Sequence, residues 1–132
     1  TVSIYVTPSY VANNIIATAK EIKKGTPKTK IYLQTILPIN TAHNLMSRQE
    51  DIRHYYYYLN KDHSPSLNQQ INETNEIIKE NDIFEVIDLH SIFLDSENEL
   101  DLRYSHDGLH LNETGYDHWM RRIKPLVDKL NK

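Results

Sequence analysis

The chain has 132 residues, of which 39% are hydrophobic, a size and composition typical of one globular domain and not of a disordered or fibrous protein. Its 15 lysines and arginines and 18 aspartates and glutamates give a net charge of -3, with both signs interspersed, which argues against nucleic acid or an anionic membrane as the main partner. The lack of cysteine excludes disulfides and thiolate zinc sites. No apolar run is long enough for a membrane span, and nothing in the sequence assigns a compartment.

The first expected elements are a helix and a buried strand. Thr7 and Pro8 indicate a helix start, because a proline at the first helical position loses no needed N–H, and apolar residues then recur every three or four positions until Gly25. Residues 31–37 form an apolar run with little alternation, which is typical of a parallel strand covered on both faces by helices. We therefore predict a central strand there.

Residues 39–62 show no clean period and predict a long surface excursion with some local helix. The tract of four tyrosines at 55–58 has two interpretations, because tyrosine offers an apolar face and a polar tip. It could form a platform for a sugar or another substrate, or it could pack under the loop. The second is the more ordinary structure.

A second helix, a second strand and a loop follow. Ser64 and Pro65 repeat the cap-then-proline pattern, and residues 83–89 predict a strand. Residues 100–111 are dense in charge and histidine and predict a loop. The helix carries a narrow apolar stripe, formed by Leu67, Ile71, Thr74 and Ile78.

The last helix is expected to start at Asn112, a good N-cap residue. Pro125 must remove one backbone hydrogen bond and is expected to kink or interrupt the helix. We expect Trp119 and Met120 to be core residues, as part of one broad apolar face with Tyr116, Ile123, Val127 and Leu130.

The order helix, strand, helix, strand, helix implies a parallel sheet with right-handed crossovers and helices on both faces. Two strands make a marginal sheet that cannot cover three amphipathic helices, and an alternating stretch at residues 1–6 would add one strand at most. We therefore expect further strands, supplied by a segment outside this sequence or by a second chain.

The most informative stretch is the sequence Asp-Gly-Leu-His-Leu-Asn at residues 107–112. Histidine is the commonest general base, and it works better when a carboxylate fixes its tautomer and stabilises the imidazolium. Asp107 and His110 could fill these roles, with Gly108 allowing a tight turn between them. An aspartate and a histidine at this spacing are nevertheless common, and in most loops they serve turns or solvent.

A metal site is the rival interpretation, because His106 and His110 are four residues apart with Asp107 between them. Two zinc-binding histidines at this spacing normally share a helix face, but Gly108 lies between these two and no helical pattern surrounds them. The other histidines show no ligand spacing. We expect neither a metal nor a cofactor.

Residues 107–112, followed by Thr114, Gly115, Tyr116 and Trp119, resemble the last conserved block of SGNH (GDSL-type) ester hydrolases, whose aspartate and histidine complete a Ser-His-Asp triad. Residues 30–38 resemble the strand that follows the asparagine-bearing block of that family. Residues 87–89 with Phe93 resemble its final strand. The resemblance spans most of residues 10–130.

This resemblance implies a three-layer α/β/α fold, flavodoxin-like, around a parallel sheet of about five strands, of which residues 1–132 would be the carboxy-terminal portion of a single domain. It also implies an ester hydrolase that forms a serine acyl-enzyme, with His110 as base and Asp107 as its orienter. The partner would be a small-molecule or glycan ester.

The family's Gly-Asp-Ser and Gly-x-Asn-Asp motifs do not occur in the sequence. The serine nucleophile would then lie outside this chain, and we expect the isolated chain to have no esterase activity. A second interpretation is a relative that keeps the fold as a non-catalytic carbohydrate-binding or interaction module. The serines of this chain are better explained by caps, turns and loops, namely Ser3, Ser9, Ser47, Ser64, Ser66, Ser91, Ser96 and Ser105.

Overall fold

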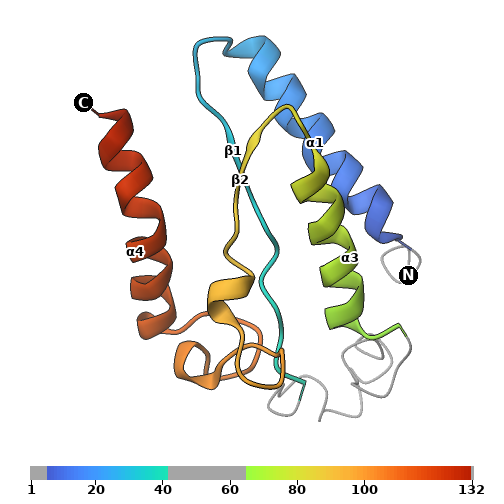
Figure 1. The fold of residues 1–132 in the computed structure, drawn as a ribbon, viewed down its shortest axis with the longest axis vertical. Helices are drawn as coiled ribbons and strands as arrows, with labels where there is room; N and C mark the ends of the chain where they lie inside the picture. Colours follow the sequence, from blue (N-terminus) through green and yellow to red (C-terminus); the bar gives the residue numbers. More distant parts are fainter. Residues whose placement is uncertain (1–5, 42–64, 132) are drawn as a thin grey trace.

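The computed structural model describes residues 6–41 and 65–131, whose course is shown in Figure 1. Helices and strands alternate in these residues as the sequence predicts. The elements are α1 (Pro8–Gly25), β1 (Tyr32–Gln34), α3 (Leu67–Glu80), β2 (Glu85–Ile87) and α4 (Glu113–Leu130), with the short 3-10 helices η4 (Ser91–Phe93) and η5 (Leu102–Tyr104) between β2 and α4.

The two strands pair in parallel, with Leu33 opposite Val86. Each strand has three residues, fewer than the seven expected for each. α1 and α3 lie side by side on one side of the strands, and α4 lies on the other (Figure 1). The chain therefore has the predicted three-layer α/β/α arrangement. Residues 1–5, which could have extended the sheet, lie outside the described residues.

α1 begins and ends where its sequence predicts. The hydroxyl of Thr7 accepts a hydrogen bond from the backbone N–H of Tyr10 at 3.1 Å, and proline occupies the first turn. Ala12 and Ala19 are buried, and their small side chains suit the close packing of α1 against α3. The main core combines these alanines with Leu33 and Ile78, against which Ile15, Ile16, Ile31, Ile77, Phe84 and Val86 pack.

The N-cap of α3 lies two residues after the cap predicted at Ser64, which is outside the described residues. The cap is Ser66, whose hydroxyl accepts from the N–H of Gln69 while the Gln69 side chain accepts from the N–H of Ser66, at 3.2 and 2.7 Å. This capping box satisfies two N–H groups of the first turn at once. The predicted stripe is confirmed at its buried members Ile71, Thr74 and Ile78.

The segment that follows β1 stays extended because two asparagines of α3 bind its backbone. The Asn75 amide accepts from the N–H of Ile36 and donates to its carbonyl, at 2.7 and 2.9 Å. Asn68 makes the same pair of bonds to Ile39, both at 3.0 Å. These side chains satisfy the backbone groups that another strand would otherwise pair.

The surface excursion predicted for residues 39–62 is wrong at its start, because Ile39 is only 3% exposed and Asn40 is buried with it. The carbonyl of Ile39 also accepts from the N–H of Leu100 at 3.0 Å, so this segment is held by the loop that follows η4 as well as by α3. The rest of the excursion, including the tyrosine tract, lies outside the described residues.

α4 starts at its predicted cap, where the Asn112 side chain accepts from the N–H of Gly115 at 2.8 Å. A Cβ at Gly115 would lie 2.5 Å from the Tyr104 carbonyl oxygen, so glycine allows η5 to approach the helix. α4 runs through Pro125 without the interruption considered above.

The prediction that Met120 is a core residue is wrong, because its side chain is 53% exposed. Trp119 is half-buried, and much of the predicted apolar face of α4 is open in the described structure. These residues of α4 are open because the helix makes most of its contacts with η5 and few with the strands. The exposed members of the face are Tyr116, Met120, Val127 and Leu130.

Candidate active site

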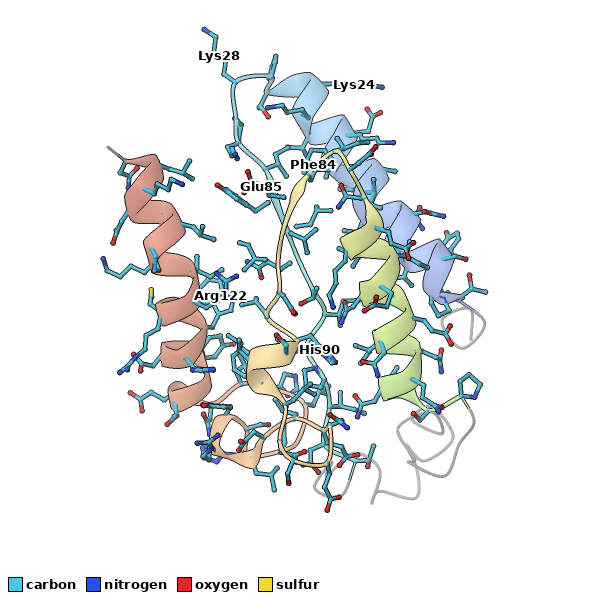
Figure 2. All side chains as sticks on the ribbon, viewed as in Figure 1. Lys24, Lys28, Phe84, Glu85, His90 and Arg122 are labelled. Atoms are coloured by element: carbon cyan, nitrogen blue, oxygen red, sulfur yellow. The ribbon has the colours of Figure 1, made fainter. Side chains whose placement is uncertain are left out.

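The carboxyl ends of the two strands are tied together by one buried threonine. The Thr35 side chain, 3% exposed, accepts from the N–H groups of Leu89 and His90, both at 2.9 Å, and donates to Asp88 at 3.1 Å. Figure 2 shows His90 at this end of β2, next to η4, and Phe84 and Glu85 at the other end. This joint fixes the edge of the sheet where parallel folds place their sites.

The two titratable groups of the joint are both perturbed. Burial alone would raise the pKa of Asp88, but hydrogen bonds from Ser91 and Thr35 outweigh it and hold the pKa below the usual value. Burial lowers the pKa of His90, against a smaller opposing effect of the Asp88 charge. Asp88 is therefore a charged group that fastens η4 to the strands.

Asp107 and His110, the two predicted site residues, meet in the loop between η5 and α4. Nδ1 of His110 lies 2.6 Å from Oδ2 of Asp107. The other carboxylate oxygen accepts from the backbone N–H groups of Leu109 and His110, at 2.8 and 2.7 Å. The His110 side chain is 72% exposed, so the turn holds the imidazole by one nitrogen and leaves its other edge toward the outside.

The Asp107 carboxylate is strongly stabilised in its charged form. Burial would raise its pKa, but the hydrogen bond with the His110 ring and the N–H groups of His110 and Leu109 hold the pKa well below its usual range. Asp107 therefore stays ionised and can accept a hydrogen bond from the imidazole over the whole neutral range.

Ser105 contacts the Asp107 turn, although the sequence did not single it out. Its hydroxyl, in a residue 2% exposed, accepts from the N–H of Gly108 at 2.9 Å and lies 3.2 Å from Oδ1 of Asp107, to which it donates. Gly108 has φ of 79°, a conformation that favours glycine. Its carbonyl accepts from the N–H of Asn40 at 2.8 Å, which joins the turn to the segment after β1.

Aromatic contacts fix the loop on its other side. The rings of Tyr104 and His118 stack with centroids 4.5 Å apart, and Phe93 meets both edge-on. Nε2 of His118 also donates to the carbonyl of Ile92 at 2.9 Å. The N–H of Asn112 donates to the carbonyl of Tyr104 at 2.8 Å. These contacts hold the residues just before the Asp107 turn, at Tyr104, and those after it, at Asn112 and His118.

Neither a serine partner for His110 nor a cluster of possible metal ligands occurs among residues 6–41 and 65–131. No serine in these two ranges is hydrogen-bonded to the His110 ring, and Ser105 contacts the carboxylate instead. No group of three or more His, Asp or Glu side chains is arranged there to hold a metal ion. In the same residues, no helix combines the length and apolar character that crossing a membrane requires.

The comparisons agree with the resemblance drawn from the sequence. A protein of Streptococcus pneumonia that is described as a platelet activating factor is 25% identical, with a TM-score of 0.68 over 92% of this chain and 52% of that one. A GDSL-like lipase of Bacteroides thetaiotaomicron is 26% identical, with a TM-score of 0.66 over 94% of this chain and 54% of that one. This chain thus spans about half the length of these structures.

No curated protein matches it significantly. The sequence model of the GDSL-like lipase/acylhydrolase family matches residues 3–123, and the chain therefore belongs to that family.

Proposed function

We propose that the protein is an ester hydrolase that forms a serine acyl-enzyme, with His110 as the base, Asp107 as its orienter and the nucleophile outside this chain. The observation that carries the proposal is the 2.6 Å contact between Nδ1 of His110 and Asp107 beside an exposed imidazole. Family membership supports the hydrolase class. This chain would be one portion of a single domain whose serine lies elsewhere.

The geometry supports a defined path for the proton. With Nδ1–H donating to Asp107, Nε2 is the unprotonated nitrogen, and it takes the proton of the serine hydroxyl as the oxygen attacks the ester carbonyl. The imidazolium then gives this proton to the leaving alcohol, and the acyl group remains on the serine. Water, deprotonated by the same nitrogen, releases the acid. Asp107 remains a carboxylate throughout and stabilises the positive charge on His110.

The test compares two exposed histidines of the same loop in the full-length protein. His110→Ala should lower kcat/KM for a short-chain nitrophenyl ester by about 10³-fold or more, because the base is lost. His106→Ala should leave it unchanged, since the His106 side chain has no part in the proposed site. Equal activity of the wild type and His110→Ala would show that His110 is not the base.

The non-catalytic alternative gives the opposite result. A full-length protein that folds cooperatively and hydrolyses no ester would favour a carbohydrate-binding or interaction module over the enzyme. The isolated 132-residue chain should be inactive under either interpretation, because the base and its orienter are two members of the triad and the nucleophile is missing.

A further inference from the structure

A groove of about 480 Å³ opens beside the Asp107 turn, on the side of the sheet covered by α1 and α3. Its volume falls within the range of small-molecule sites. Four parts of the chain meet in it: the start of α1, the segment after β1, the first two turns of α3, and Leu109. The lining residues are Val6, Pro8, Val11, Ile36, Leu37, Pro38, Ile39, Leu67, Gln70, Ile71, Thr74 and Leu109.

The described lining is apolar and carries no charge. Its polar members are Gln70 and Thr74, and both donate to backbone carbonyls, in α3 or just before its cap. The Thr74 hydroxyl donates to the Gln70 carbonyl at 2.8 Å, and the Gln70 amide donates to the Pro65 carbonyl at 3.2 Å. Such a lining favours a hydrocarbon over a sugar, whose hydroxyl groups need hydrogen-bond partners when they lose water.

The groove is built into the fold and is held by specific contacts. Ile39 and Ile71 form a small core at its base, against which Ile36, Leu67 and Leu109 pack. The amides of Asn75 and Asn68 satisfy the backbone of Ile36 and Ile39. The segment can therefore form an apolar wall without water on its peptide groups.

Leu109 connects the groove to the proposed chemistry. Its side chain packs against the base of the groove, while its N–H donates to Asp107 at 2.8 Å, and the next residue is His110. An acyl chain bound in the groove would therefore lie next to the turn that carries the base. From this adjacency and the apolar lining, we infer that the groove binds the acyl chain of the substrate and selects aliphatic chains of several carbons over acetyl. The inference rests on the proposed ester hydrolase function.

The chain-length preference of the full-length protein tests the inference. With nitrophenyl esters from acetate to decanoate, kcat/KM should rise by about fourfold for each added methylene until the groove is filled, which corresponds to about 0.8 kcal/mol per buried methylene. A profile that is flat or that peaks at acetate would overturn the inference and leave the proposed function standing.

Bulky substitutions locate the effect. Val11→Trp and Leu67→Trp place an indole in the groove from two different walls, and each should lower the octanoate-to-acetate ratio of kcat/KM by at least about tenfold. Ile22→Trp is the matched control, because Ile22 is on α1, 51% exposed and outside the groove. Circular dichroism melts show which variants are folded. If both folded variants keep the wild-type ratio, the groove is not the acyl site.

A binding measurement separates this inference from the proposed function. Calorimetry should show that the full-length protein binds decanoate at least about tenfold more tightly than butyrate, and that Leu67→Trp removes the difference. If decanoate binds in this way but no ester is hydrolysed, the groove is a site for aliphatic chains and the proposed ester hydrolase fails. If no ester is hydrolysed and decanoate does not bind, both fail.

Discussion

Two aspartates stand at the carboxyl end of the sheet, and the comparison between them separates a structural carboxylate from a candidate functional one. Asp88 accepts hydrogen bonds from Thr35 and from the N–H of Ser91, groups that tie the strands to η4. Asp107 uses one oxygen in the same way but directs the other at an exposed imidazole. Both have a lowered pKa, so the perturbed pKa alone does not identify a functional group.

The largest expected effect is on activity, and it belongs to Asp107 alone. Asp107→Asn should lower kcat/KM of the full-length protein by about 10⁴-fold, because the amide favours the wrong tautomer of His110 and cannot stabilise the imidazolium. Asp88→Asn should change kcat/KM by only a few-fold, since Asp88 is not bonded to the imidazole. Steady-state kinetics with one nitrophenyl ester measures both.

Two results would remove the distinction between the carboxylates. The first is a comparable loss of activity in Asp88→Asn with the protein still folded. The second is full activity in Asp107→Asn. In either case the contact with His110 would not be the feature that defines the site.

The next largest effect is on stability, and it belongs to the joint around Asp88. Thr35→Val keeps the shape of the side chain but leaves the N–H groups of Leu89 and His90 without an acceptor, at a cost of about 2–4 kcal/mol in the free energy of unfolding. Urea unfolding of the full-length protein measures this change. Thr18→Val, at an exposed position of α1, should be nearly neutral. A neutral Thr35→Val would mean that the joint does not stabilise the sheet.

The sequence predicted the helices well because their signals are local. Thr7 and Asn112 accept hydrogen bonds from N–H groups of the next turn, and Pro8 suits the first helical position, so the sequence places both of these helix starts. β1 came out shorter at its end because an amide from a distant helix, Asn75, binds the N–H and the carbonyl of Ile36, which would have extended the strand. On a helix wheel such an asparagine looks like an ordinary polar position.

The sequence also predicted part of the candidate site, because the signal that selects it is local. Asp107 and His110 are close in sequence, and the spacing together with the family resemblance was enough to select them, although their catalytic role remains a prediction. Ser105 was assigned with the other serines to caps, turns and loops, because its contact with the carboxylate depends on the φ of Gly108 and on burial, which the sequence does not reveal. The groove was missed altogether, because its walls come from four separate segments.

A smaller effect is expected at Ser105, which we propose positions the carboxylate without touching substrate. Ser105→Ala leaves the buried N–H of Gly108 without an acceptor and frees one side of Asp107, so it should cost about 1–3 kcal/mol of stability. It should also lower kcat roughly tenfold with little change in KM. Ser105→Thr keeps the hydroxyl, and the extended backbone of residue 105 suits threonine, so this variant should restore kcat. A loss that threonine does not restore would indicate a packing role instead.

The smallest effect is the pH dependence of stability, where the two carboxylates should behave alike. Because folding lowers the pKa of Asp107, its charged form contributes stability that is fully present above the unfolded pKa of about 3.9 and is lost as the pH falls toward the folded pKa. The difference in unfolding free energy between the wild type and Asp107→Asn should therefore be constant above about pH 5 and shrink below pH 4. Asp88→Asn should show the same sign, since the pKa of Asp88 is also lowered.

Urea unfolding from pH 3 to pH 7 measures both differences in unfolding free energy, and a difference that grows toward acid would contradict the assigned direction of the pKa. With a common response to acid, only the loss of activity in Asp107→Asn separates the carboxylate that orients a base from the one that fastens a strand.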